Sequence, residues 1–217
     1  MLYLGYITIL LKFALWELLP VLPMMALFHF IMVRKDKKGN VKTPARHILA
    51  VYLFCLAVLA VLSITSVPDV FRLSFEPTIN LAPFSDFPEG LLHDLSNILL
   101  FLPVGFLLPM LWKKFDKWQT ALLCGFFFSL SIEVSQLFNS RITDIDDLLL
   151  NTAGAIIGYF IFKFVKKRAP GISAFAIGHA NHWKWEPYAC FCFAWITLLF
   201  FHHFISGWLI TGAPAIQ

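Results

Sequence analysis

A run of polar and charged residues interrupts one of the most apolar parts of this chain, whose mean hydropathy is +0.75. It comprises Glu133, Gln136, Arg141, Asp144, Asp147 and Asn151. A carboxylate at the centre of a bilayer costs about 3 kcal/mol on insertion scales, so several beside a lipid-spanning stretch indicate a site.

The chemistry open to this run depends on its balance of charges. Glu133, Asp144, Asp147 and the more distant Asp94 are four acids against Arg141. Crowding of acids in apolar surroundings favours a proton on at least one carboxyl, and a divalent cation could neutralise them instead. The guanidinium suits a phosphate or carboxylate of an incoming molecule.

A purely structural interpretation remains open for several of these residues. Asp144, Asp147 and Asp94 stand where helices should begin, so they could cap a helix or favour its dipole. Arg141 could simply pair with an acid across a loop. Glu133 is harder to explain in this way, because it lies about 7 Å below the expected end of its helix.

The composition places the chain among integral membrane proteins. It is 59% hydrophobic, 17% aromatic and only 14% charged. Crossing a hydrocarbon core of about 30 Å takes about 20 apolar residues as a helix. We therefore predict an all-α, polytopic helical bundle with about six spans, at residues 13–33, 47–66, 96–112, 118–138, 145–164 and 188–210.

The positions of Lys and Arg predict the orientation, because short basic loops stay in the cytoplasm. Basic residues collect in alternate connections, and both termini should therefore lie outside. The inward set is Arg34, Lys35, Lys37, Lys38, Lys42, Arg46, Lys113, Lys114, Lys117, Lys163, Lys166, Lys167 and Arg168. The net charge of +4 then reflects topology and anionic inner-leaflet lipid, and a nucleic-acid partner has no support.

Helical spacing places the polar groups of three spans on narrow stripes, each within an arc of roughly 80°. Asp146 lies nearly opposite its stripe. The stripes are Asp94, Asn97, Phe101 and Gly105; Gly125, Ser129, Glu133, Gln136 and Ser140; and Asp144, Asp147, Asn151, Gly154 and Gly158.

We expect the three stripes to converge at the outer end of the bundle. Gly105, Gly125, Gly154 and Gly158 would let helices approach closely, since helix association in lipid depends on packing. Above that contact the helices would enclose a polar pocket open to the outer leaflet. In this scheme residues 1–66 supply two spans, 67–168 the core with its outer loop, and 169–217 a cytoplasmic loop and the last span.

Residues 80–158 resemble the VanZ-like family of bacterial membrane proteins, whose founding member is associated with resistance to teicoplanin. The matching motifs are Asn80-Leu81-x-Pro83-Phe84, Asn97-x-x-x-Phe101-x-Pro103-x-Gly105, Glu133-x-x-Gln136, Arg141-x-x-Asp144-x-x-Asp147 and Asn151-x-x-Gly154-x-x-x-Gly158. Ala82 replaces the more usual bulky apolar residue. The resemblance implies a multi-pass protein of the bacterial cytoplasmic membrane. It does not imply any particular biochemical activity.

Three functions follow from these observations. The first is binding or handling of an envelope lipid, a cell-wall precursor or a lipoglycopeptide by Asp94, Asn97, Glu133, Gln136, Arg141, Asp144, Asp147 and Asn151. The second is an intramembrane enzyme that acts on a lipid-linked substrate, with Glu133 as general base, Asp147 beside it and a metal ion as an option. His93 lies just outside this group, and the sequence has no nucleophile elbow and no metal motif. The third is a proton-coupled lipid transporter or flippase, which polar groups gathered at one side disfavour.

We favour the first of these, in which the chain binds its ligand, over an enzyme, and the sequence does not decide whether a reaction is catalysed. No resident metal or other cofactor is expected, although a divalent cation remains possible. Membrane lipids and an envelope precursor or lipoglycopeptide are the expected partners, and the sequence leaves the oligomeric state open.

Overall fold

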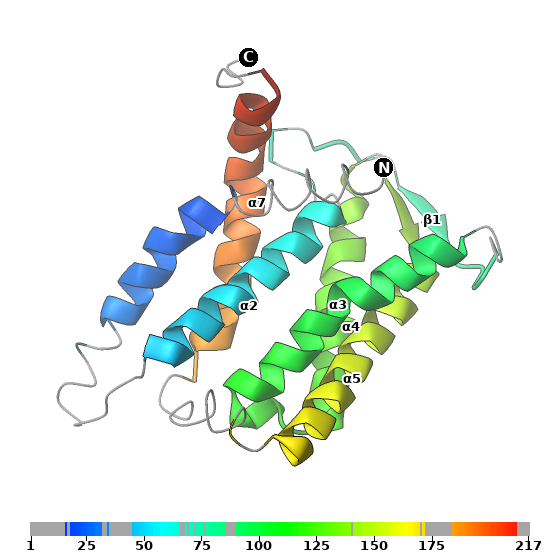
Figure 1. Ribbon diagram of the computed structural model, residues 1–217. Helices are drawn as coiled ribbons and strands as arrows, with labels where there is room; N and C mark the ends of the chain where they lie inside the picture. The colour runs from blue at the N-terminus through cyan, green and yellow to red at the C-terminus, as the bar shows by residue number, and fades with distance from the viewer. Residues whose placement is uncertain are drawn as a thin grey trace.

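Helices account for most of the described chain (Figure 1). The computed structural model describes residues 16, 18–31, 34, 45–65, 68, 70–71, 73–75, 77–85, 90–139, 141–169, 171 and 184–211, the side chains of Ala45 and of residues 202–211 excepted. Its helices are an N-terminal helix, Leu18–Ile31, then α2 (Ala45–Ile64), α3 (Leu91–Leu111), α4 (Trp118–Gln136), α5 (Ile145–Arg168) and α7 (Glu186–Thr211), with a short 3-10 helix η1 (Lys113–Phe115).

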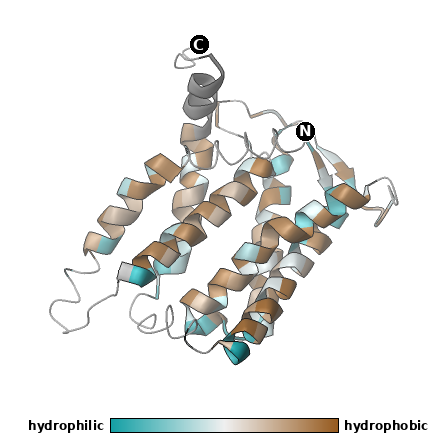
Figure 2. Cartoon of the chain, viewed as in Figure 1, coloured by the Kyte–Doolittle hydropathy of each residue, from teal (hydrophilic) through white to brown (hydrophobic). Residues whose placement is uncertain are grey.

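Each helix falls on one of the six apolar stretches expected from the sequence. Within the described residues, three helical segments are long and apolar enough to cross a membrane, namely Arg46–Ile64, Leu91–Leu111 and Ile145–Arg168. The apolar segments Leu18–Ile31 and Glu186–Phe201 are shorter. Figure 2 shows hydrophobic residues along the lengths of the helices and several of the most hydrophilic ones at the ends of α2, α3 and α5.

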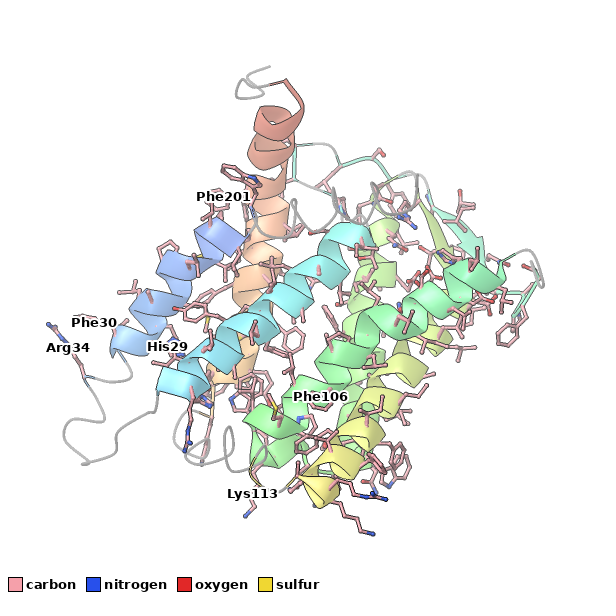
Figure 3. The ribbon with its side chains drawn as sticks, in the orientation of Figure 1. His29, Phe30, Arg34, Phe106, Lys113 and Phe201 are labelled. Atoms are coloured by element: carbon pink, nitrogen blue, oxygen red, sulfur yellow. The ribbon has the colours of Figure 1, made fainter. Side chains whose placement is uncertain are left out.

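The bundle has two chemically different ends. At one end, which we call the basic end, Lys163 and Lys166 of α5 bind Asp116, and Lys114 of η1 donates to the carbonyl of Lys184. Figure 3 places Lys113 at this end. The opposite end, which we call the polar end, holds the starts of α3 and α5 and the end of α4.

Glycines allow close contacts around α5. A Cβ on Gly105 would lie 2.0 Å from the carbonyl oxygen of Ala155, and one on Gly154 would lie 2.3 Å from that of Ile98. Gly158 meets the backbone of α3 in the same way, whereas Gly125 of α4 faces the Ala155 side chain. The Gly154 and Gly158 pair thus packs on α3, and Ala155, one residue around the helix, is the contact with α4.

The all-α expectation needs one addition, a two-stranded parallel sheet at the polar end. Strand β1 (Thr78–Asn80) pairs with β2 (Ile142–Asp144), with Thr78 opposite Ile142 and Asn80 opposite Asp144. Strands of three residues carry too little alternation to be recognised in a sequence. This pairing holds the segment before α3 against the start of α5.

Aromatic side chains join the remaining helices through the core. The Phe54 ring of α2 lies 5.1 Å from that of Trp112 and 5.4 Å from that of Phe191 in α7. Phe128 of α4 links Phe191, at 5.0 Å, to Phe101 of α3, at 5.3 Å. These contacts form an apolar layer between the two ends of the bundle.

Candidate ligand-binding site at the polar end

The start of α5 positions the first part of the site. Asp144 precedes the helix in an extended conformation, and its Oδ1 accepts a hydrogen bond from the Asp146 amide at 2.9 Å, as an N-cap does. Its other oxygen accepts from the side chain of Asn80 at 3.0 Å. Asp144 therefore caps α5 and also binds the segment that carries β1.

Glu133 of α4 lies against this cap. Its side chain is buried, with the residue 3% exposed, and Oε2 accepts from the Asp144 amide at 3.0 Å. The Glu133 carbonyl accepts from the hydroxyl of Thr143 at 3.1 Å. The Glu133 carboxylate and the Glu133 carbonyl thereby hold the end of α4 against the start of α5.

Two amide side chains connect the three helices. Asn97 of α3 donates to Asp147 Oδ1 at 2.6 Å, and Asn151 of α5 donates to the hydroxyl of Ser129 in α4 at 3.0 Å. His93 Nδ1 lies 3.7 Å from the same Asp147 oxygen, at the exposed edge of the group. Residues from the three predicted stripes thus meet at one end of the bundle, with α5 between α3 and α4.

Two basic side chains, those of Arg141 and His93, lie near enough to these carboxyl groups to act on them electrostatically. The charge of Arg141 acts on both Glu133 and Asp147, and that of His93 acts on Asp147. Asp144 and Asp147 also act on Glu133. The group therefore combines three neighbouring acids with one guanidinium, as the sequence suggested, and has a histidine at its edge.

Four buried oxygens at this end accept no hydrogen bond from the described part of the protein. They are Glu133 Oε1, Gln136 Oε1, Asp146 Oδ1 and Asn151 Oδ1. A buried acceptor without a donor costs about 1–3 kcal/mol, and few are found in native proteins. Because all four are acceptors, the polar end is suited to a molecule that brings hydrogen-bond donors.

Two of the predicted site residues have other surroundings. Gln136 is buried, but its amide nitrogen donates to the carbonyl of Thr65, directly after α2, at 2.9 Å. It therefore ties α2 to α4. Asp94 is half-buried in the first turn of α3 and forms none of the hydrogen bonds described above.

The Asn80-Leu81-Ala82-Pro83-Phe84 motif forms a turn fixed to the site. Asn80 Oδ1 accepts from the Ala82 amide at 3.1 Å, which closes the turn locally. Asp146 Oδ2 accepts from the Phe84 amide at 2.8 Å, and Phe84 has a φ of 55°, a conformation that non-glycine residues rarely adopt. Asp146, which the helical spacing had set apart, therefore holds this turn.

The same turn exposes large apolar side chains next to the polar group. Leu81 is 72% exposed and Phe84 53% exposed, and the preceding segment leaves Phe75 67% exposed. A contiguous apolar surface of this kind is typical of contact with lipid or a ligand. At the polar end, acceptor oxygens without hydrogen-bond donors therefore lie close to exposed apolar side chains.

A second buried polar cluster, which the sequence analysis did not find, lies at the basic end. Glu186 of α7 accepts from His29 Nε2 at 2.9 Å, from His47 Nε2 at 2.8 Å and from Trp112 Nε1 at 2.8 Å. Figure 3 shows His29 between the N-terminal helix and the start of α2. These residues are at most 5% exposed. Polar groups are therefore not confined to one end, contrary to the sequence reading.

This second cluster had no signal in the sequence, because its residues come from four helices and share no spacing.

Among the described residues, no group of three or more His, Cys, Asp or Glu side chains is arranged to hold a metal ion. The histidines at 179, 182, 202 and 203, and Glu17, lie outside the described residues or side chains.

One of three comparisons with known proteins finds a match, to a protein family. A family model described as VanZ/LLP1 matches residues 49–166, which run from α2 to the last turn of α5 and include all eight predicted ligand-binding residues. No curated protein and no solved structure matches the chain.

Proposed function

Because the chain belongs to the VanZ/LLP1 family, we propose that it is a multi-pass protein of the bacterial cytoplasmic membrane whose polar end binds an envelope molecule. In this proposal six helices span the membrane, the basic end faces the cytoplasm and both termini lie outside. The molecule bound is an envelope lipid, a cell-wall precursor or a lipoglycopeptide, and binding contributes to teicoplanin resistance.

The observation that supports this proposal most is the pairing of unmatched acceptors with exposed apolar side chains. A headgroup bearing an ammonium or hydroxyl groups supplies the donors that Glu133 and Asn151 lack, and Arg141 adds a site for an anionic group. Leu81 and Phe84 stand beside them for an acyl chain. An amphipathic molecule satisfies both halves of this surface.

Replacement of Glu133 by Gln tests the role of the carboxylate. Gln keeps an oxygen for the Asp144 amide but turns the unmatched acceptor into a donor, so the fold should persist while binding falls. We expect an at least tenfold loss of teicoplanin binding to the purified protein, since hydrogen bonds to charged groups contribute about 1.5–3 kcal/mol. A strain that produces this variant should lose its resistance.

The matched control is Ser135→Ala on the same turn of α4. Ser135 donates only to the Ile132 carbonyl of its own helix, at 2.7 Å, so its removal should leave binding unchanged. Equal susceptibility of the Glu133→Gln and Ser135→Ala strains, with equal protein levels and helix content, would rule out the proposed site.

The second buried cluster favours one alternative, a proton-coupled lipid transporter. Titratable groups then exist at both ends, with His29, His47 and Glu186 at the basic end and Glu133 at the polar end. In proteoliposomes such a transporter would move fluorescent phosphatidylethanolamine between leaflets faster under a pH gradient. Rates that are the same with and without the gradient would leave binding as the function.

A further inference from the structure

A long apolar groove lies between α4 and α7, and none of the predicted ligand-binding residues lines it. Its first part has a volume of about 330 Å³ and is lined chiefly by aromatic side chains, including Phe115, Phe127, Phe128, Tyr188 and Phe191. Its second part, about 440 Å³, is lined by Leu73, Val134, Phe138 and Leu199.

The two parts form one channel along α4. Ser131 and Trp195 line both of them, so the groove continues from Leu123 of α4 to Phe138, two residues past the end of that helix. The helical part, from Leu123 to Gln136, rises about 20 Å. One leaflet of a hydrocarbon core of about 30 Å is about 15 Å deep, so the groove is long enough for an acyl chain of one leaflet.

A lysine side chain lies at the mouth of the groove at the basic end, and three other lysines lie close to it in the sequence or in the fold. Lys114 lies directly at this mouth, because its ammonium is 4.1 Å from the centre of the Tyr188 ring and 5.0 Å from that of Phe115, and both rings line the groove. Lys113, Lys117 and Lys184 are exposed nearby in the sequence and in the fold.

The acids near this mouth are engaged elsewhere. Asp116 binds Lys163 and Lys166 of α5, and Glu186 is turned inward to the two histidines and Trp112. Burial lowers the pKa of Lys114, while the nearby Cys124 thiol acts in the opposite direction. An anion placed at the mouth would therefore meet lysines whose charge is not neutralised by these carboxylates.

We propose that this groove binds an anionic phospholipid of the cytoplasmic leaflet, with its phosphate at Lys114 and one acyl chain along Phe127, Ser131 and Trp195. The charge at the mouth specifies the headgroup, and the apolar walls accept the chain. The proposal rests on the orientation given under the proposed function but uses none of the residues proposed to bind the envelope molecule.

The test is lipid retention by the purified protein after incubation with equal amounts of phosphatidylglycerol and phosphatidylcholine, measured by native mass spectrometry. We expect the wild-type protein to retain phosphatidylglycerol preferentially. Lys114→Gln should weaken that binding about fivefold, the effect of one basic residue at an anionic membrane surface. Inorganic phosphate should not displace the lipid, because it supplies no chain for the groove.

Two further variants separate the headgroup from the chain. Lys167→Gln removes an exposed charge from the same end, on α5 and away from the groove, and should leave retention unchanged. Ser131→Trp fills the middle of the groove and should reduce retention of both lipids, with Cys124→Phe as a second filling variant. Equal loss in Lys114→Gln and Lys167→Gln, no preference between lipids, or full retention in both filling variants would overturn the proposal.

Discussion

Glu186→Ala is expected to destabilise the protein by about 3–5 kcal/mol, because it removes the acceptor shared by three buried donors. His29, His47 and Trp112 would then be left in apolar surroundings without the carboxylate, and the N-terminal helix, α2, α3 and α7 would lose a common contact. Thermal unfolding of the detergent-solubilised protein, followed by circular dichroism, measures this loss.

The control for Glu186 is Asp116→Ala at the same end of the bundle. Asp116 also has two basic partners, but its side chain is 20% exposed and the lysines are more so. Pairs of this kind contribute about 0–1 kcal/mol. Replacing His29, His47, Trp112 and Glu186 together by apolar residues should recover much of the stability, and a Glu186→Ala effect no larger than that of Asp116→Ala would contradict the role given to this carboxylate.

Gly105→Ala is the second change with a large expected effect. Alanine is the better helix former by about 1 kcal/mol, so in an open position this change would stabilise α3. At Gly105 the new Cβ would lie 2.0 Å from the Ala155 carbonyl oxygen, a backbone atom that cannot rotate away. We expect α3 and α5 to separate and the protein to lose about 1–3 kcal/mol of stability.

Gly171→Ala is the matched control, since nothing in the described part of the chain lies within 4 Å of a Cβ placed there. It should be neutral or slightly stabilising in the same thermal unfolding measurement. Because Gly105 packs between the polar end and the middle of the bundle, Gly105→Ala should also increase hydrogen exchange at Asn97 and Asn151. Similar melting temperatures for the two alanine variants would show that α3 and α5 do not approach this closely.

The positions of the helices could be predicted from the length of the apolar stretches alone. The convergence of Asn97, Glu133 and Asp147 could also be predicted, because a spacing of 100° per residue places each of them on the face of its own helix that carries glycines. The sequence did not show which of these helix faces contact one another. Gly154 contacts Ile98 of α3 rather than α4, and this choice depends on packing between whole helices.

What the sequence could not show depends on contacts between distant segments. Glu186 meets His29 across 157 residues, and each of these residues alone resembles an ordinary polar group at a helix end. Asp146 had been separated from its neighbours by helical spacing, and the structure gives it a partner, the Phe84 amide, in a loop 62 residues away. Neither contact leaves a periodic trace in the sequence.

The parallel pairing of β1 with β2 has a consequence for how the chain is assembled. Asn80 is made 64 residues before its partner Asp144, and α3 and α4 lie between them. The turn at Phe84 therefore cannot acquire its final geometry while the ribosome is still adding these two helices. Formation of α5 is the event that completes the polar end, so a chain truncated before β2 would leave this surface unfinished.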